Sequence, residues 1–310
     1  MRILFLGTAE FACTSLEALL ASPYELLGVI TQPDRPRGRG QKWVPSPVKS
    51  LALKANIPVY QPEKVRDPSF LKVLESIRPD LMVVVAYGQI LSAAVLSIPP
   101  KGCINVHGSL LPKYRGAAPI FRAILGGESR TGVTTMFLDP GMDTGPMLLT
   151  EETEIGEEDT AGTLHECLSQ MGARLLLRTL EGLDGSTLIP HPQDHSRATY
   201  APKIEKGEAR INWNTPARQI FNLIRGFDPW PGAFTAWAGR VLKLFRPRFE
   251  ENDTPEAPGT IIQASKEGLR ISTSYGYLLI REVQMENRPR MDVAEFLKGY
   301  PLQAGVRLGD

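Results

Sequence analysis

Hydrophobic runs of strand length alternate with stretches of helical periodicity over the first part of the chain. The pattern predicts strands at residues 2–6, 26–31, 58–60, 81–86, 104–107 and 133–138, and helices at residues 10–20, 46–55, 69–77, 119–125 and 163–180. Thr163 and Glu166 fit a capping box at the start of the last helix, and Gly182 offers its end. Such alternation favours an α/β fold with a Rossmann-like, doubly wound and mostly parallel sheet.

A different pattern follows in the last third of the chain. It predicts one short helix at residues 215–225 and strands at residues 234–237, 241–249, 259–264, 269–273 and 277–285. Five short strands with one helix favour a small OB-like β-barrel. A polar stretch with several prolines separates the two patterns. We therefore expect a Rossmann-like domain at residues 1–188, a linker at 189–205 and a β-barrel domain at 206–310.

The stretch from Cys103 to Asp143 carries the most informative polar residues. Successive side chains of a strand alternate between faces, so Asn105 and His107 project the same way and the apolar residues beside them project the other way. An amide and an imidazole at this spacing can both point at one oxygen, as the stabilisation of an oxyanion in acyl transfer requires. A carboxylate such as Asp143 would orient the imidazole and help it donate a proton. An isolated Asn or His at a strand end more often caps the neighbouring backbone.

Other chemistries find less support in the sequence. Ser109 lies two residues after His107 and no G-x-S-x-G elbow is present, so a covalent hydrolase is the weaker hypothesis. Gly7 is the one glycine in a first turn where the dinucleotide fingerprint has three, which disfavours NAD. His191 and His195 are four residues apart, but a proline between them and the lack of a third ligand nearby favour exposed linker histidines over a metal site.

The composition is that of a globular protein, with 42% apolar and 22% charged residues and a formal net charge of +1. The N-terminal apolar run is too short for a signal peptide or a membrane span, so we expect a cytoplasmic protein without a membrane partner. We also expect a monomer and no metal. Cys13, Cys103 and Cys167 are odd in number and far apart, which favours free thiols over a disulfide or a zinc site.

The charges are unevenly distributed. Residues 1–205 carry a net charge of −2 and residues 206–310 a net charge of +3. Within the segment from Asp34 to Lys49 one acid faces five basic residues, Arg35, Arg37, Arg39, Lys42 and Lys49. Charge alone slightly favours a solvated loop. The alternative is a grip on phosphates, because Arg matches phosphate oxygens in two-point contacts.

The sequence Asn105–Gly116, together with Asp143, resembles the active-site signature of the folate-dependent formyltransferases. The resemblance covers the whole chain and extends to the bacterial members that formylate methionyl initiator tRNA. Thr31–Gly40 is similar to the loop with which those members grip tRNA, and Ala198–Ile204 to their linker. Asp228–Ala233 matches the start of their C-terminal domain, a turn that sugar formyltransferases share.

The resemblance implies 10-formyltetrahydrofolate as the formyl donor and the α-amino group of methionine on initiator tRNA as the acceptor. It implies a catalytic set of Asn105, His107 and Asp143 and no metal. The implied folate contacts are Ser109, Leu110, Leu111, Pro112, Gln89, Ile90 and Leu91, and the implied tRNA contacts are Arg35, Arg37, Arg39 and Lys42, with Arg39 the foremost.

Two other functions stay open at this point. An N-formyltransferase acting on an amino-sugar nucleotide would resemble this chain in both domains, but it has no need of a basic loop. A folate- or RNA-binding protein without turnover is a different class of answer. The intact set of Asn105, His107 and Asp143 disfavours it.

Overall fold

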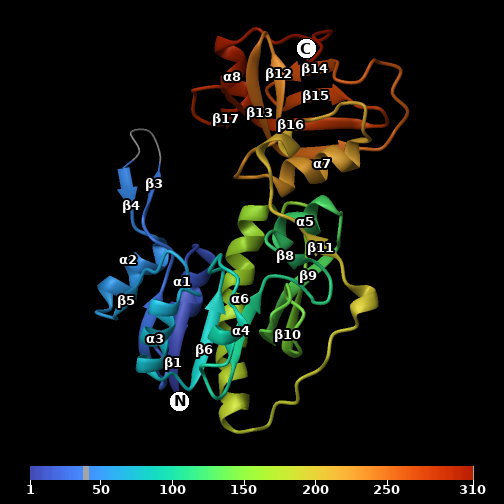
Figure 1. Cartoon of the computed structure of the whole chain (residues 1–310). Coiled ribbons are helices and arrows are strands. Elements are labelled where there is room, and N and C mark those ends of the chain that lie inside the picture. The colour runs from blue at the N-terminus through green and yellow to red at the C-terminus, as the bar shows by residue number, and fades with distance from the viewer. Residues whose placement is uncertain (38–41, 310) are drawn as a thin grey trace. The chain divides into compact units, whose positions relative to one another are not determined.

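The computed structural model describes residues 1–37 and 42–309, and its chain folds into two compact units (Figure 1). The first unit comprises Met1–Pro119, Thr131–Thr153 and His165–Ala201, and the second comprises Ile120–Arg130, Glu154–Leu164 and Pro202–Asp310. The two units therefore interleave along the sequence. The domain boundaries expected at residues 188 and 205 stay a prediction.

A seven-stranded sheet forms the centre of the first unit. Its strands lie in the order β10 (Met147–Glu154), β9 (Arg130–Phe137), β7 (Cys103–His107), β6 (Leu81–Val85), β1 (Arg2–Gly7), β2 (Glu25–Ile30) and β5 (Val59–Tyr60). The five strands from β7 to β5 run parallel, and β9 pairs with β7 antiparallel. The predicted Rossmann-like, mostly parallel sheet is confirmed. Strand order reverses between β1 and β6, and open α/β sheets bind ligands beyond the carboxyl ends of strands at such a point.

Helices accompany this sheet. They are α1 (Phe11–Leu20), α2 (Pro47–Lys54), α3 (Pro68–Ile77), α4 (Ala93–Leu96) and the long α6 (Ala161–Asp184). Leu74 of α3 and Val95 of α4 belong to one buried cluster with Leu4, Met82 and Cys103 of three neighbouring strands. The odd-numbered positions of β7 therefore face α3 and α4, because side chains alternate along a strand.

The start and end of α6 differ from the prediction. Thr160, not Thr163, caps the helix: its hydroxyl accepts a hydrogen bond from the Thr163 backbone N–H at 3.2 Å, and the Thr163 hydroxyl accepts one from the Thr160 N–H at 2.9 Å. The helix passes through Gly182 and ends at Asp184. The capping box with Glu166 and the stop at Gly182 were wrong, because a short polar side chain one turn earlier satisfies the free N–H groups first.

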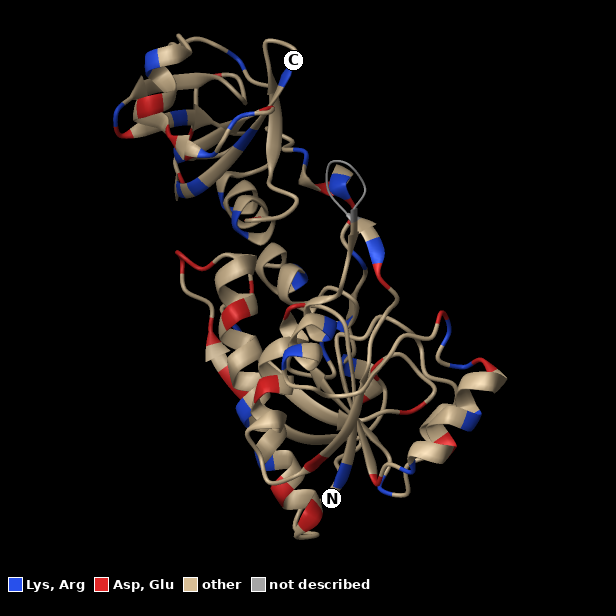
Figure 2. Ribbon diagram, turned by 90° about the vertical axis from the view of Figure 1, so that its left-hand side faces the viewer, with Lys and Arg blue, Asp and Glu red and all other residues tan. Residues whose placement is uncertain are grey.

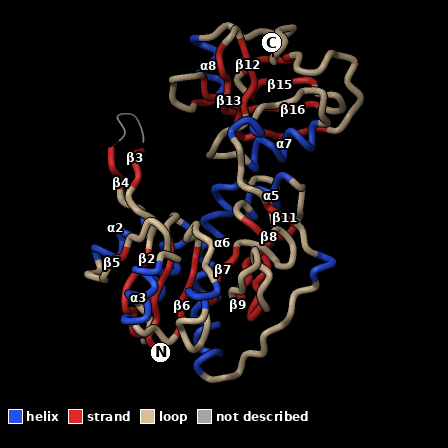
Figure 3. Tube along the Cα trace, viewed as in Figure 1, coloured by secondary structure: helices blue, strands red, loops and turns tan. Residues whose placement is uncertain are grey.

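An antiparallel sheet forms the second unit (Figure 3). Its order is β12 (Phe234–Trp237), β13 (Arg240–Glu250), β16 (Tyr277–Met285), β15 (Gly268–Ser272) and β14 (Ile261–Ser265), and β17 (Met291–Asp292) pairs with β16. The helices of this part are α5 (Pro119–Leu125), α7 (Ala217–Gly226) and α8 (Val293–Gly299). The prediction of a small β-domain after the Rossmann-like domain is confirmed, and the periodicity did not predict α8.

The second unit includes two short segments that precede residue 165, and two arginine side chains bind these segments to the rest of the unit. Arg122 of α5 holds Glu208 through two hydrogen bonds of 2.6 and 3.1 Å. The buried Arg225 of α7 donates to the carbonyl oxygens of Gly156 at 2.7 Å and Asp159 at 3.1 Å. Because a buried guanidinium must find acceptors, these bonds fix the segment before α6 against α7.

The remaining strands are short. They are β3 (Arg35–Arg37), β4 (Lys42–Val44), β8 (Arg115–Gly116) and β11 (Tyr200–Ala201), and two single-turn 3₁₀ helices occupy His195–Arg197 and Lys206–Ala209. The basic segment predicted as a loop contains an antiparallel hairpin of β3 and β4. The stretch predicted as a linker pairs with the first unit, through β11 beside β8 and through a bridge between His191 and Met147. No helix in the described part of the chain is long and apolar enough to span a membrane.

Candidate active site

Asn105 and His107 lie at the carboxyl end of β7, and both are buried. Between them, Val106 faces the opposite side of the sheet, where α6 passes so closely that a Cβ on Gly172 would lie 2.8 Å from the Val106 side chain. The strand is held on both sides, since Asn105 pairs with β6 and His107 with Thr134 of β9. The alternation expected from the sequence is present, and the sheet fixes where the two polar side chains start.

The imidazole of His107 is oriented by two groups. Its Nε2 lies 2.9 Å from the carbonyl oxygen of Tyr114. A carbonyl oxygen only accepts hydrogen bonds, so Nε2 carries a proton. The other nitrogen, Nδ1, lies 3.7 Å from Oδ2 of Asp143. Nδ1 is therefore the ring atom that faces the carboxylate and can exchange a proton.

Asp143 approaches His107 from the loop after β9. Its backbone has a φ of +52°, a left-handed conformation that is unfavourable for a residue with a Cβ. Its Oδ2 accepts a hydrogen bond of 2.8 Å from the backbone N–H of Gly116. The side chain is 17% exposed. The structure thus places a partly accessible carboxylate with a left-handed backbone at the imidazole, and the sequence had predicted a carboxylate such as Asp143 near it.

The carboxamide of Asn105 differs from its neighbours. Asn105 is 9% exposed, and none of the hydrogen bonds among residues 1–37 and 42–309 involves its side chain. The buried polar side-chain atoms that lack a partner in the described part of the chain belong to Ser15, Tyr87, Arg225 and Arg270, so the Asn105 carboxamide is open to solvent at the site. Such an unmet donor is typical of a group that binds a ligand atom, and it fits an oxyanion or a carbonyl oxygen.

Ser109 has a structural role. Its hydroxyl donates to the Lys113 carbonyl oxygen at 2.7 Å, and its own carbonyl accepts from the Thr134 hydroxyl at 2.7 Å. The same Thr134 hydroxyl accepts from the Leu111 N–H at 3.2 Å. Ser109 is 1% exposed, and its proton is committed to a carbonyl. No base activates this hydroxyl in the described structure, which leaves the covalent hydrolase hypothesis without a nucleophile. These bonds shape the predicted folate segment, in which Leu110 and Pro112 are half-buried.

The second predicted folate segment follows β6, the parallel neighbour of β7. Gln89 is used by the protein itself: its Oε1 accepts from the Val65 N–H at 2.8 Å and its Nε2 donates to the Glu63 carbonyl at 3.1 Å. Leu91 is buried in the core. Ile90 is 81% exposed. Of this segment, Ile90 is therefore the side chain that offers apolar surface to a ligand.

Three of the predicted tRNA contacts, Arg35, Arg37 and Lys42, lie in the hairpin of β3 and β4, whose ribbon carries Lys and Arg (Figure 2). Arg35 forms an exposed ion pair with Glu63 at 3.1 Å. Arg37 and Lys42 belong to the paired strands, and Arg39 lies outside the described residues. Trp43, beside Lys42, is 70% exposed.

Lys49 plays another part than the hairpin's basic residues. It bonds Asp34 at 2.7 Å, and this bond, together with one from Gln61, holds the pKa of the Asp34 carboxyl below its ordinary value. The bond between Lys49 and Asp34 therefore joins the two ends of the basic segment, and the Lys49 ammonium group is less available to bind a phosphate.

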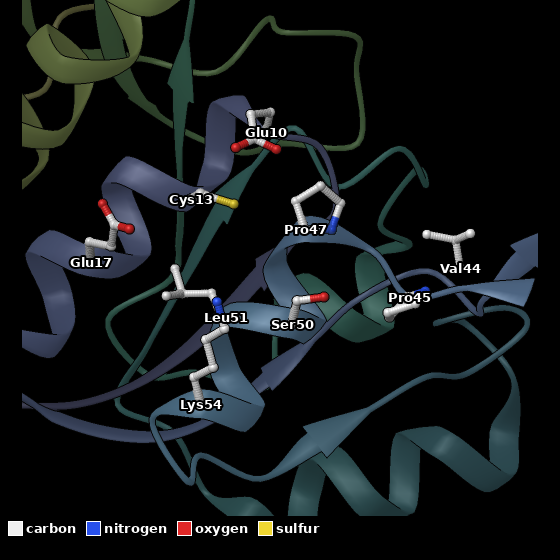
Figure 4. A pocket seen from close by; sticks show the side chains of 9 residues that line it. All are labelled: Glu10, Cys13, Glu17, Val44, Pro45, Pro47, Ser50, Leu51 and Lys54. Carbon is white, nitrogen blue, oxygen red and sulfur yellow. The ribbon is translucent and has the colours of Figure 1, made fainter. Parts of the chain in front are cut away.

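A separate pocket of about 410 Å³ lies between α1 and α2 (Figure 4). It is lined by Glu10, Cys13, Glu17, Val44, Pro45, Pro47, Ser50, Leu51 and Lys54. Burial, followed by the charges of Glu10 and Glu17, raises the pKa of the Cys13 thiol to about 11. A thiol that stays protonated is a poor nucleophile. None of the predicted catalytic residues lines this pocket, so the candidate site for acyl transfer is the end of β7.

Arg115 and Gln193 also belong to the site, and sequence reasoning missed them as site residues. Arg115 is 2% exposed, and its Nε and Nη2 donate to Oε1 of Gln193 at 3.0 and 2.6 Å. Arg115 lies inside the signature quoted above, which could have singled it out. Gln193 lies in the polar stretch between the domains, where no pattern marked it. His195, in the same stretch, is exposed as expected, and its Nδ1 lies 3.2 Å from Arg115 Nη2.

Comparison with known proteins identifies the two parts of the chain. Residues 1–180 match the formyl transferase family, and residues 203–301 match the formyl transferase C-terminal domain. The methionyl-tRNA formyltransferase of Trichlorobacter lovleyi is 49% identical over 99% of this chain and 96% of its own length. That of Acetivibrio thermocellus is 50% identical over the full length of both.

Solved structures share the fold. WlaRD, a sugar 3N-formyl transferase, matches with a TM-score of 0.68 and 21% identity over 93% of this chain and 99% of its own. HypX from Aquifex aeolicus in complex with tetrahydrofolic acid matches with a TM-score of 0.65 and 18% identity over 100% of this chain and 51% of its own. At these identities the likeness concerns the fold alone. The two domain matches and the full-length relatives establish that the chain belongs to the formyl transferase family, among the methionyl-tRNA formyltransferases.

Proposed function

We propose that the chain transfers a formyl group from 10-formyltetrahydrofolate to the α-amino group of methionine on initiator tRNA. Relatives with this activity in their names match it over its whole length. The observation that carries the chemistry is the Asn105 carboxamide, which lies at the end of β7 in a residue that is 9% exposed and makes no hydrogen bond within the described part of the chain. A donor of this kind, next to His107 and Asp143, suits an acyl carbonyl whose oxygen becomes negative during transfer.

The residues at the end of β7 fit a formyl donor. The segment Ser109–Pro112 begins two residues after the end of β7, and the exposed side chain of Ile90 follows the neighbouring strand. We assign the folate to these two segments, with Ile90 in contact with its pterin ring and Gln89 and Leu91 supporting Ile90 from behind. HypX, which shares the fold, has been solved with tetrahydrofolic acid.

The acceptor supplies the nucleophile. The α-amino group of an esterified amino acid has a pKa near 8, so a neutral amine is available close to pH 7. Its lone pair attacks the formyl carbon, and the Asn105 carboxamide donates to the oxygen as negative charge develops there. His107, fixed at Nε2 by Tyr114, presents Nδ1 beside this charge.

Asp143 completes the proton path. The attacking nitrogen must lose a proton and N10 of the folate must gain one before it leaves. Asp143 lies 3.7 Å from Nδ1 of His107 and is partly accessible, so it can take the proton of the amine through a water molecule and support a charged imidazole. Attack on the formyl carbon forms the new C–N bond and the oxyanion, and the bond to N10 breaks when the oxyanion collapses. The proton that leaves the amine passes through Asp143, Nδ1 of His107 and water to N10, which departs protonated.

The basic hairpin supplies the tRNA contact in this proposal. Arg35, Arg37, Arg39 and Lys42 meet phosphates near the acceptor end, and the C-terminal residues 206–310, with their net charge of +3, meet the backbone further along. The exposed indole of Trp43 adds a surface on which a base can stack. Asn105, His107 and Asp143 come from one chain, so the activity requires only a monomer, and its place in translation implies the cytoplasm.

Formyl transfer from 10-formyltetrahydrofolate tests the proposal when methionyl initiator tRNA and a set of 4-amino-sugar nucleotides are offered as separate acceptors. We expect N-formylmethionyl-tRNA and no formylated sugar. Transfer to the sugar alone would replace this function by the sugar formyltransferase. Binding of both substrates without transfer to either would leave a folate- and RNA-binding protein.

A further inference from the structure

The stretch around residues 191–201 contacts the site at several points. The Thr199 hydroxyl accepts from the Tyr114 N–H at 2.8 Å, and the Thr199 carbonyl accepts from the Arg115 N–H at 2.9 Å. Tyr114 is the residue whose carbonyl holds Nε2 of His107. One side of the imidazole is thus anchored through this stretch.

Gln193 anchors the other side. Its Nε2 donates to the carbonyl oxygen of Asp143 at 2.8 Å and to that of Gly145 at 2.8 Å. Its Oε1 accepts both bonds from Arg115. The orientation of the amide is unambiguous, because guanidinium only donates and carbonyl oxygens only accept. All four hydrogen-bonding positions of the Gln193 side chain are therefore occupied, in a residue that is 6% exposed.

These bonds act on a residue with a left-handed backbone conformation. Asp143 has a φ of +52°, and a non-glycine residue keeps such a conformation only where its surroundings impose it. The Gly116 N–H holds its carboxylate, and Gln193 holds its backbone. The guanidinium of Arg115 holds Gln193, and Gly116 directly follows Arg115, so the two supports of Asp143 depend on neighbouring residues.

We propose that Gln193, backed by the buried guanidinium of Arg115, is a positioning residue that holds the strained backbone of Asp143 with its carboxylate against His107. The stretch between the domains is then part of the catalytic apparatus. This inference rests on the proposed function, because it assumes that Asp143 takes part in the transfer.

Two substitutions separate the bonds of Gln193. Gln193→Glu keeps an oxygen for Arg115 but loses both N–H donors and sets a negative charge against two carbonyl oxygens. Gln193→Leu removes all four bonds at similar volume. Gln170→Glu, at an exposed position of α6, is the matched control for the change of charge. The variants are compared by steady-state formyl transfer, by the pH dependence of kcat and by thermal unfolding.

We expect Gln193→Glu to lower kcat about 100-fold, with the KM of both substrates changed less than threefold and the pH profile of kcat altered, because a displacement of about 1 Å at a reacting group has this order of effect. Gln170→Glu should match the wild type. A kcat within threefold of the wild type for either Gln193 variant would overturn the inference. A loss of rate that only follows loss of folded protein, with an unchanged pH profile in the folded fraction, would also overturn it.

Asp143→Asn, measured in parallel, separates this inference from the proposed function. If Asp143→Asn is inactive and Gln193→Glu is fully active, the positioning role fails and the proposed chemistry stands. If Asp143→Asn is as active as the wild type, the catalytic assignment itself fails, and the inference about Gln193 fails with it.

Discussion

Nδ1 of His107 lies 3.7 Å from Oδ2 of Asp143, and the opposite ring nitrogen of His107 donates to the Tyr114 carbonyl. One nitrogen of the imidazole is thus committed to the backbone, and the other faces a carboxylate at slightly more than hydrogen-bond distance. A small movement or one water molecule closes that distance. In the proposed mechanism, Nδ1 and Asp143 are therefore the pair that transfers the proton.

Asp143→Asn should therefore remove turnover and spare binding. The amide keeps an oxygen for the Gly116 N–H but cannot take up a proton, so we expect kcat to fall by about 10²–10⁴-fold. The dissociation constant for tRNA, measured by filter binding, should change less than about twofold, since Asp143 makes no phosphate contact in the proposed mechanism. Equal losses of rate and of tRNA affinity would remove Asp143 from the chemistry.

Asn105→Ala should affect rate far more than stability. The carboxamide has no hydrogen-bond partner in the described protein, so its loss should change the free energy of unfolding by less than about 1 kcal/mol. Loss of an oxyanion donor should lower kcat by about 10²–10³-fold.

Asn222→Ala is the matched control. Asn222 is also buried, but its Oδ1 accepts a 3.0 Å bond from Arg225, so we expect it to cost about 1–3 kcal/mol in denaturant unfolding. If Asn105→Ala proves as destabilising as Asn222→Ala, Asn105 serves the fold and not a ligand.

Neutralising the hairpin should weaken tRNA binding selectively. Replacing Arg37, Arg39 and Lys42 by Gln should raise the KM for tRNA. It should also flatten the dependence of this KM on salt concentration, because binding with fewer phosphate contacts releases fewer counterions. The KM for folate should stay the same.

Lys49→Gln serves as the comparison for the hairpin, since Lys49 is paired with Asp34 and should affect tRNA less. Parallel changes in the two KM values of the hairpin variant would end the assignment of the hairpin to tRNA.

Cys13 should react slowly with alkylating reagents. Burial, Glu10 and Glu17 raise the pKa of its thiol to about 11 from an ordinary value of 9.0, so at pH 8 only ~0.1% is thiolate. The exposed Cys167 is an internal control, and mass spectrometry after treatment with iodoacetamide should find it modified at least 10-fold faster.

The same pKa of Cys13 has a consequence for stability. A pKa raised by folding stabilises the folded state below pH 9, and this contribution is lost as the pH rises toward about 11. Cys13→Ser should therefore lessen the fall of stability over that range. Equal alkylation of Cys13 and Cys167 at pH 8 would contradict the burial of the thiol.

Gly172→Ala should loosen the strand that carries the site. The added Cβ would lie 2.8 Å from the Val106 side chain, so α6 or β7 must shift. Overpacking of this kind costs about 1–3 kcal/mol, against which the better helix propensity of Ala returns only about 1. Gly207→Ala, where nothing lies within 4 Å, is the control. A variant at Gly172 as stable and active as the control would show that α6 has room to move.

The long periodic elements could be read from the sequence because burial imposes their pattern directly. The strand predicted at residues 277–285 is β16 as observed, and the apolar residues 81–86 gave the central β6. Predictions that depended on one side chain did less well. Thr160 took the cap expected of Thr163, since both are equally able to accept a hydrogen bond and only the path of the chain before α6 selects between them.

Several short strands could not be predicted from the sequence for a related reason. The strands β3 and β4 contain three residues each, and β8 and β11 two, so each is too short for any period to show. They form because their backbone groups pair with a second strand: β3 with β4 nearby in the sequence, and β8 with the distant β11. The basic segment expected as a solvated loop contains such a hairpin, and the polar stretch expected as a linker pairs with the strand β8 beside the site.

The sequence by itself determined the two fold classes, the strand that ends at His107, and the presence of an amide, an imidazole and a carboxylate suited to acyl transfer without a nucleophile. Local periodicity and residue chemistry are enough for these. The tertiary structure alone decided that Nδ1 of His107 faces Asp143, that the Asn105 carboxamide makes no hydrogen bond within the described part of the chain, and that Gln193 donates to the Asp143 carbonyl oxygen. Each of these depends on contacts between residues up to 50 positions apart, which only the packing of the sheet and its loops can bring together.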